Sequence, residues 1–331
     1  MTKVGLVLGA GGIVGQAYHA GVLAALEQDL GWDPRTADVI VGTSAGSLTG
    51  AALSVGVPAM DLAAWSVQVE PSDEGRPFFE ALGADGVELP PFDPRRMLRP
   101  WRLPSPQLLA RVARRPWAFR PSVAALTLLP PGWVDLSEHA DAVIPLLGEE
   151  WPGHLRICAA RADSGARVVF GRAGAPEATL DRAVAASCAI PGYFQPVEIG
   201  GVDYFDGGVH SPTNADVLRE EHLDLVIVSS PMSAAHGRAM TPDASFRWAN
   251  HRRLERECKR LRAAGTEVVR FEPTASVLRA MGMNAMADDR SDRVTRAAFF
   301  EVGARAIEDP VAARLAMVAS RPSRAAVVDA A

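Results

Sequence analysis

A serine between two glycines is the first residue of the chain that could do chemistry. Residues 42–46 read Gly42-Thr-Ser44-Ala-Gly46 and fit the pattern G-x-S-x-G. In this pattern the serine occupies a sharp strand-to-helix turn, which holds its hydroxyl above a sheet, while the glycines leave room for neighbouring backbone. A helix that starts at such a turn also favours developing negative charge near the serine. The pattern predicts that Ser44 is a catalytic nucleophile.

The surroundings of the serine support this prediction, because the motif alone is common in a glycine-rich chain. An apolar run at residues 39–41 predicts a buried strand before the turn, and residues 47–55 are compatible with a helix after it. The same order, a strand at 4–8 and a helix at 16–30, occurs once before. This repetition predicts βαβ units and a parallel sheet.

A second glycine turn, Gly9-Ala-Gly-Gly-Ile-Val-Gly15, follows the first predicted strand. One interpretation is a dinucleotide site, but Val14 stands where the third glycine of G-x-G-x-x-G is required. The second predicted strand also ends in Gly42, with no acidic residue to hold a ribose. A nucleotide-binding protein is therefore the weakest of the functions considered.

The favoured interpretation of this turn is an oxyanion hole. Backbone N–H groups around Gly11, Gly12 and Ile13, at the head of a helix, would bind the oxygen of a tetrahedral intermediate. Adjacent parallel strands would place this turn beside Ser44.

A nucleophilic serine needs a base, and the histidines provide no recognisable local motif. We expect most of them to lie at the surface: His19, His139, His154, His210, His222, His236 and His251. Asp206 is the better candidate, because Gly207 and Gly208 follow it and let the backbone bring a carboxylate close to another loop. A carboxylate is a weak base, so it must be partly desolvated or closely hydrogen-bonded to take the serine proton.

The composition limits the remaining function classes. The 331 residues have 48% apolar side chains and a net charge of -5, which argues against a general nucleic-acid binder. Three widely spaced cysteines, Cys158, Cys188 and Cys258, predict reduced and mostly buried thiols without a metal site. The sequence has neither a signal peptide nor a long apolar window, so we expect a cytoplasmic protein whose contact with lipid would be peripheral.

Residues 70–150 differ from the rest of the chain because they are rich in proline, tryptophan and arginine. Two interpretations remain open: an irregular helical insertion packed over the sheet, or a lid or acyl-binding cap whose Trp and Arg side chains meet an anionic lipid surface. Beyond it, strands are predicted at 155–160, 167–170, 202–205, 223–229 and 267–271, and helices at 181–189, at 246–264 and after Pro273.

Taken together, these motifs resemble those of the patatin-like phospholipases. Three blocks match in order: the turn 9–15 with the following residues 18–23, then residues 42–46, then residues 186–192 running on to Asp206-Gly-Gly208. The third block is the most specific, and together the blocks cover most of residues 1–60 and 180–230. They leave the insertion and the C-terminal hundred residues unidentified.

The resemblance implies a three-layer α/β/α patatin-like fold with a mainly parallel central sheet and a helical or irregular insertion. It implies a dyad in which Ser44 attacks an ester carbonyl and Asp206 is the base, with no calcium, metal ion or cofactor. The substrate class would be a lipid or lipid-like ester. We expect one domain over residues 1–310 and a C-terminal tail at 311–331; the sequence does not indicate an oligomeric state.

Two residues depart from the family pattern in the glycine turn. The family usually has glycine at position 10 and a basic residue at position 14, where this chain has Ala10 and Val14. Backbone donors survive such changes, but a side chain that could anchor phosphate is lost. The alternative hypothesis is therefore a patatin-like binding or regulatory protein with little catalysis.

Overall fold

The computed structural model describes most of the chain. The described residues are 2–83, 105–118, 123–124, 129, 132–136, 150–235, 243–306 and 309–319. The predicted insertion at 70–150 is thus described only in part.

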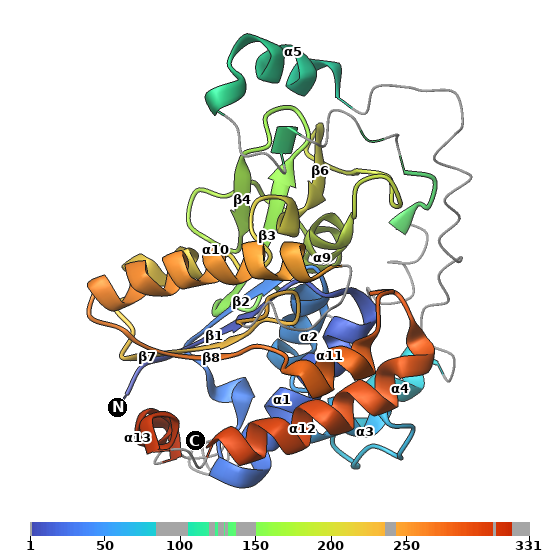
Figure 1. Cartoon of the computed structure of the whole chain (residues 1–331). Helices are drawn as coiled ribbons and strands as arrows, with labels where there is room; N and C mark the ends of the chain where they lie inside the picture. The colour runs from blue at the N-terminus through green and yellow to red at the C-terminus, as the bar shows by residue number, and fades with distance from the viewer. Residues whose placement is uncertain are drawn as a thin grey trace.

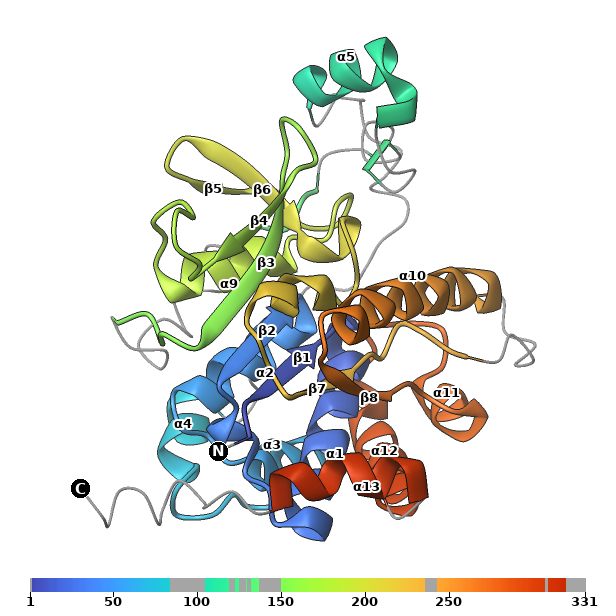
Figure 2. The ribbon, with the colours of Figure 1, turned by 90° about the vertical axis from the view of Figure 1, so that its left-hand side faces the viewer.

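A mixed, mostly parallel sheet forms the centre of the molecule (Figure 1). Its strands are β1 (Val4–Leu8), β2 (Val39–Thr43), β3 (Leu155–Arg161), β4 (Arg167–Phe170), β5 (Val197–Ile199), β6 (Val202–Asp206), β7 (Leu225–Ser229) and β8 (Glu267–Phe271). They lie in the order β5-β6-β3-β2-β1-β7-β8, with β4 beside β3. The pairs between β8, β7, β1, β2 and β3 are parallel, whereas β4, β5 and β6 are joined antiparallel. Figure 2 shows the part of the sheet with β3, β4, β5 and β6 above the part with β1, β2, β7 and β8.

Helices cover both faces of the sheet, because the central strands are buried on both sides. Leu6 and Leu8 of β1 face a core shared with α1 (Gly12–Leu30), α2 (Ala45–Ser54), α9 (Leu180–Cys188), α11 (Ala275–Met281), α12 (Ser291–Ala306) and α13 (Asp309–Ala319). Val7, between them, faces the opposite core under α10 (Ala244–Ala263) and the 3-10 helix η5 (Ala215–Glu220). Figure 1 shows α10 on one side of the sheet and α1 and α12 on the other. The three-layer α/β/α fold expected from the sequence is therefore confirmed.

Continuous apolar, β-branched runs were sufficient to predict most strands. The predicted bounds at residues 4–8, 167–170 and 267–271 agree with β1, β4 and β8. α1 begins at Gly12, four residues before its predicted start, because the glycine turn itself forms the first helical turn. The short strand β5 was missed, and so was α3 (Ala59–Ser66).

The described part of the insertion contains α4 (Arg76–Leu82), α5 (Pro106–Arg114) and the 3-10 helix η3 (Pro116–Ala118). Leu108 of α5 is fully buried and packs in a small cluster with Phe205, the residue before Asp206. On the outside, Trp117 of η3 is 82% exposed. Residues 84–104 and 137–149 lie outside the described residues, so the interpretation as lid or cap remains a prediction.

The C-terminal helices α12 and α13 pack against α1 and against the sheet. Leu315 and Val318 of α13 are fully buried in the main core, so an ordered helix lies across the predicted start of the tail at residue 311. Residues 320–331 lie outside the described part of the chain. Among the helices of the described residues, none combines the length and the apolar character needed to span a bilayer.

Candidate active site

Two strands that run in opposite directions end against neighbouring residues of β3. Thr43, the last residue of β2, pairs with Cys158, and Asp206, the last residue of β6, pairs with Ala159. Because β4 occupies the other edge of β3 at both positions, β2 and β6 share one edge and meet end to end. This topology brings Ser44, which follows Thr43, beside Asp206.

Ser44 forms the strained turn that the motif predicts. Its backbone has φ 53° and ψ -122°, a positive-φ conformation that non-glycine residues rarely adopt, and it is 4% exposed. Its N–H donates to Ser187 Oγ over 2.9 Å, and the Ser187 hydroxyl donates to the Cys158 carbonyl over 2.7 Å. The turn is therefore held by α9 and β3, which lie far from it in sequence.

The glycines of the motif permit the close packing of this turn. A methyl group at Gly46 would lie only 2.0 Å from the carbonyl oxygen of Leu8 in β1, so no other residue fits. A methyl group at Gly42 would likewise lie only 2.6 Å from the Cα atom of Ser47. α2 begins at Ala45 and points its N-terminus toward Ser44, where the positive end of the helix dipole favours an anion.

The Asp206 carboxylate is 5% exposed and accepts a hydrogen bond from the Gly208 N–H at 2.6 Å. It also interacts with the Ser44 hydroxyl. Burial raises the pKa of Asp206 to about 6, although both of these contacts act to lower it. Above this pH the carboxylate is ionised and lies beside the serine hydroxyl, which is the arrangement a general base requires.

The first turn of α1 carries the predicted oxyanion donors. The N–H groups of Gly9 and Ala10 donate to Ser229 and Pro212, and that of Gly15 donates to Gly11. Within the part of the chain that the structure describes, the N–H groups of Gly11, Gly12 and Ile13 have no acceptor. Unpaired donors at a helix start attract anions.

This turn lies close to residues that neighbour Ser44 and Asp206 in the chain. A methyl group at Gly15 would contact Ala45, the residue after Ser44, at 3.5 Å. A methyl group at Gly208 would contact Ala10 at 3.3 Å. The two departures from the family pattern are both buried: Ala10 is 5% exposed and Val14 is 4% exposed.

His19 is a residue of this region that sequence reasoning missed. Its side chain is fully buried, and Nε2 lies 2.7 Å from the carbonyl oxygen of Gly9 while Nδ1 lies 2.7 Å from Ser229 Oγ. Since a carbonyl only accepts, Nε2 donates to it and Nδ1 accepts a hydrogen bond from the Ser229 hydroxyl. Burial lowers the pKa of His19 to about 4, so the ring is neutral and fastens the glycine turn to β7. The signal available in the sequence was a histidine within the apolar stretch that follows the glycine turn.

The expectation that most histidines lie at the surface is wrong for the described ones. His19 and His251 are buried, His154 and His210 are half-buried, and only His222 is exposed. His251 packs against Glu272, with Nδ1 at 2.9 Å from Oε1.

The cysteines follow the expectation of buried thiols, with one at an unforeseen position. Cys158 and Cys258 are buried, and Cys188 is partly buried; all three are free. Cys188 interacts with the Ser44 hydroxyl, and its Sγ lies 3.7 Å from Ser47 Oγ. Burial, reinforced by the charge of Asp206, raises the pKa of the Cys188 thiol to about 12, so it stays neutral.

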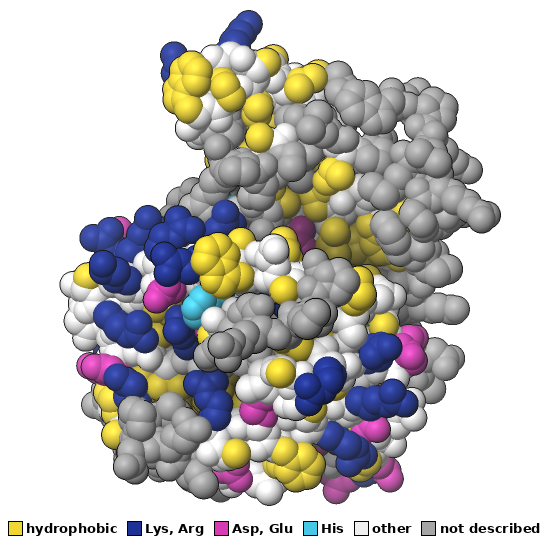
Figure 3. Space-filling view, in the orientation of Figure 1, with side chains coloured by type: hydrophobic (Ala, Val, Ile, Leu, Met, Phe, Trp, Pro, Cys, Tyr) yellow, Lys and Arg dark blue, Asp and Glu magenta, His cyan; other side chains and the backbone are white. Residues whose placement is uncertain are grey.

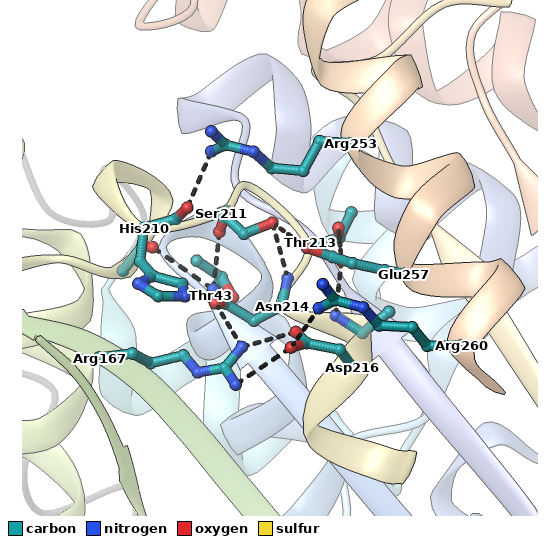
Figure 4. Close-up of polar contacts among 12 residues, drawn as sticks. Thr43, Arg167, His210, Ser211, Thr213, Asn214, Asp216, Arg253, Glu257 and Arg260 are labelled. Carbon is teal, nitrogen blue, oxygen red and sulfur yellow. Dashed lines mark hydrogen bonds and ion pairs between the residues drawn. The ribbon is translucent and has the colours of Figure 1, made fainter. Parts of the chain in front are cut away.

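Asn214 connects the loop of the serine with the loop of the aspartate (Figure 4). Its side chain is fully buried, and Nδ2 donates to Thr43 Oγ1 at 3.1 Å, to the Ser211 carbonyl at 2.6 Å and to the Gly207 carbonyl at 3.4 Å. Thr43 precedes Ser44 and Gly207 follows Asp206. Asn214 has φ 50°, the left-handed conformation that asparagine tolerates best among non-glycine residues.

The same loop is fastened to α10. Glu257 of α10 is buried and accepts hydrogen bonds from Ser211 Oγ at 2.6 Å, Thr213 Oγ1 at 2.7 Å and the Ala215 N–H at 3.0 Å (Figure 4). Arg253, also on α10, donates to the His210 carbonyl at 2.8 Å. The residues after Asp206 are thus held from the α10 side of the sheet.

A pocket of about 190 Å³ lies beside the glycine turn. Its lining is mainly apolar and consists of Val14, Met232, Asp243, Phe246, Arg247, Gly282, Met283 and Ala285. Val14 also donates its N–H to the Ala285 carbonyl at 3.2 Å. The position that is usually basic in the family is here an apolar wall. Among the described residues, no group of three His, Cys, Asp or Glu side chains could hold a metal ion.

Comparison with known proteins shows the family of the chain. The sequence model of the patatin-like phospholipase family matches residues 6–219, which include the glycine turn, Ser44 and Asp206. The crystal structure of VipD from Legionella pneumophila is similar with a TM-score of 0.43 and 14% identity, over 91% of this chain. The chain spans 66% of that structure's length. A search among curated proteins gave no match. Since the family model covers well over half of the residues, the chain belongs to the patatin-like phospholipase family.

Proposed function

We propose that this patatin-like protein is a serine acyl-ester hydrolase in which Ser44 is the nucleophile and Asp206 the base. Membership of the family supports lipid acyl hydrolysis in general. The observation that carries the finer proposal is the buried interaction of the Ser44 hydroxyl with a carboxylate whose pKa is about 6. A base with a pKa near the working pH takes a proton efficiently and returns it in the next step.

In the acylation step, Ser44 Oγ attacks the ester carbonyl carbon while its proton moves to Asp206. The carbonyl oxygen becomes an oxyanion, and the N–H groups of Gly11, Gly12 and Ile13 are the proposed donors to it. The intermediate collapses when the bond from carbon to the alcohol oxygen breaks. The alcohol leaves with the proton from Asp206, and the acyl group remains on Ser44.

Deacylation repeats these movements with water. Asp206 takes a proton from a water molecule, whose oxygen attacks the acyl carbon. The bond from carbon to Ser44 Oγ then breaks, and Ser44 recovers the proton from Asp206. The products are a carboxylic acid and the free enzyme, so atoms and charges balance.

Hydrolysis of a short p-nitrophenyl ester tests the proposal. We expect Ser44→Ala and Asp206→Asn each to lower kcat/KM by at least about 10³-fold. His210→Gln is the control, because His210 lies in the loop after Asp206 but has no part in the proposed chemistry. A His210→Gln enzyme as inactive as Ser44→Ala would replace the dyad by a histidine-dependent mechanism.

The alternative is a binding or regulatory protein on the same scaffold. The apolar Val14 at the pocket wall favours it, because the side chain at this position of the glycine turn cannot anchor a phosphate. Labelling by a fluorophosphonate probe separates the two proposals, since the probe reacts only with an activated serine. Wild-type protein that labels at Ser44, with Ser44→Ala as blank, supports the hydrolase; absence of labelling supports the alternative.

The substrate we propose is a lipid or lipid-like ester, with peripheral contact to a membrane. The insertion, of which α5 packs beside the strand of Asp206, is proposed as its lid or acyl-binding cap. A cytoplasmic location follows as a proposal from the sequence composition.

A further inference from the structure

The helix α10 presents much of its positive charge away from the sheet. Four exposed cations, which we name the basic face, follow each other at helical spacing: Arg252, Arg256, Lys259 and Arg260. The opposite side of the helix is buried, for example at Leu254. Figure 3 shows Lys and Arg side chains gathered over this helix.

The basic face has few counter-charges, although the chain as a whole has a net charge of -5. Its exposed acidic neighbour is Glu255, which pairs with Arg252 at 3.2 Å. Arg260 lies 3.6 Å from Asp216, a carboxylate that Arg167 already binds at 2.6 Å. Arg256 and Lys259 form no ion pair with any described residue. This face therefore attracts anionic surfaces.

Large apolar side chains adjoin the basic face at the N-terminal end of α10. Phe246 and Trp248 are 53% and 52% exposed, and the guanidinium of Arg252 lies 5.9 Å from the Trp248 ring centre. Met283, across the pocket from α10, is 69% exposed. Aromatic side chains that are half exposed beside cations are typical of the interface between a membrane and water.

This apolar end lies close to the candidate active site. Phe246 and Met283 line the same pocket as Val14 of the glycine turn. Arg247 donates to the Pro231 carbonyl at 2.7 Å, and the Pro231 ring packs against Gly11, one of the proposed oxyanion donors. The pocket therefore joins the surface of α10 to the glycine turn.

We propose that the basic face together with Phe246, Trp248 and Met283 docks on an anionic phospholipid bilayer. The cations meet the headgroups, while the apolar side chains enter the interface beside the pocket. This docking serves the proposed function, because the pocket would receive an acyl chain beside the glycine turn. Nucleic acid fits the surface less well, since Phe246 and Met283 border a pocket by the glycine turn.

Vesicle flotation with the inactive Ser44→Ala protein tests the docking without turnover. We expect Ser44→Ala to float with vesicles of phosphatidylcholine and phosphatidylglycerol, and to bind vesicles of phosphatidylcholine alone at least about tenfold more weakly. Adding Arg256→Glu and Lys259→Glu should lower binding to the anionic vesicles by at least about tenfold, and added salt should do the same.

The matched control is Arg293→Glu with Arg296→Glu on α12, which makes the same change at the same helical spacing on an exposed part of the opposite layer. It should leave vesicle binding within about twofold. Trp248→Ser should weaken binding, whereas Phe300→Ser, at a side chain 72% exposed on α12, should not.

Three results would each overturn the docking surface. The first is an equal loss of vesicle binding in the α10 and α12 variants, and the second is equal binding to neutral and anionic vesicles. The third is tighter binding to a single-stranded oligonucleotide than to the vesicles. Fluorophosphonate labelling of the wild type is measured separately. Flotation without labelling would support the docking surface and reject the hydrolase. Labelling without flotation would support the hydrolase and reject the docking surface.

Discussion

At Ser44 the backbone is held in a conformation that costs free energy. A non-glycine residue at φ 53° and ψ -122° is strained by about 1–3 kcal/mol. The strain is tolerated because the N–H of Ser44 is bonded to Ser187 and the neighbouring glycine fits tightly against β1. The hydroxyl is thereby kept beside Asp206 rather than turned into the helix.

The strain gives a prediction in which two inactive variants differ in stability. Ser44→Gly removes the steric cost at positive φ, whereas Ser44→Ala keeps it. Allowing for the greater entropy of glycine in the unfolded chain, Ser44→Gly should have a free energy of unfolding about 1 kcal/mol above that of Ser44→Ala. Urea denaturation of both proteins measures the difference; equal values would show that the turn is unstrained.

In the proposed mechanism, the carboxyl group of Asp206 sets the acid limb of activity. Below its pKa of about 6 the group is protonated and cannot take the proton of Ser44. We expect kcat/KM to fall about tenfold per pH unit below this pKa and to be level above it. A pH profile with a soluble ester measures this limb, and a plateau extending unchanged to about pH 4 would contradict the assignment of the base.

The same carboxyl group lowers stability at neutral pH. Its pKa is raised in the folded protein from 3.8 to about 6, so the folded state binds the proton more tightly than the unfolded state. Its contribution to stability is present below about pH 4 and is lost as the pH rises through about 6. Asp206→Asn should therefore raise the free energy of unfolding by up to about 3 kcal/mol at about pH 8, with little gain below about pH 4. Thermal denaturation across this range shows the difference; a pH-independent effect would contradict the shift.

Among the elements, the loop between β6 and η5 depends on one side chain. Asn214 ties Thr43, the residue before Ser44, to Gly207, the residue after Asp206. Asn214→Gly keeps the left-handed backbone but removes the side chain. We expect it to lower kcat about tenfold with little change in KM, because the pair is positioned less precisely.

The control for this prediction is Thr36→Ala, which removes a hydroxyl bonded locally to the Asp33 carbonyl, away from β6. It should leave kcat unchanged. An Asn214→Gly enzyme with a normal kcat and only reduced stability would assign Asn214 a purely structural role.

The sequence predicted where strands and helices lie along the chain better than it predicted which of them contact each other. β1, β4 and β8 follow from apolar, β-branched runs, and the Ser44 turn follows from its place between such a run and a helix. The antiparallel return of β6 along β3 could not be predicted, because strand pairing over such separations depends on how the whole sheet closes. His19 and Asn214 were missed for the same reason: their partners lie in other strands and loops, so no local spacing points to them.

At the scale of the molecule, the chain beyond the family match supports the glycine turn. α12 packs along α1, and the approach is close at Gly21, where a methyl group would lie 2.3 Å from the Thr295 carbonyl oxygen and 2.9 Å from Ala298. Thr295 Oγ1 also donates to the Ala17 carbonyl at 3.0 Å. The C-terminal helices thus help to fix the helix whose first turn carries the proposed oxyanion donors.

Two glycine substitutions in α1 and α12 should differ in their effect on the free energy of unfolding, because only one of them overpacks this contact. Gly21→Ala forces α1 and α12 apart and should lower the free energy of unfolding by about 1–3 kcal/mol. Gly303→Ala in α12 meets only the flexible end of the Asp29 side chain and should be neutral or stabilising by up to about 1 kcal/mol. Chemical denaturation ranks the two, and a reversed order would show that the helices do not approach so closely.

The hydroxyl of Ser187 has a consequence for the order of events in folding. It satisfies the N–H of Ser44 across 143 residues of chain and is itself anchored on β3. A nascent chain that has made only its first two βα units has no partner for that amide, and relaxation of the turn would relieve its strain. A reactive serine should accordingly form only after α9 has docked. During refolding, fluorophosphonate labelling should therefore recover later than the helical signal. Its recovery would report when this last long-range contact forms.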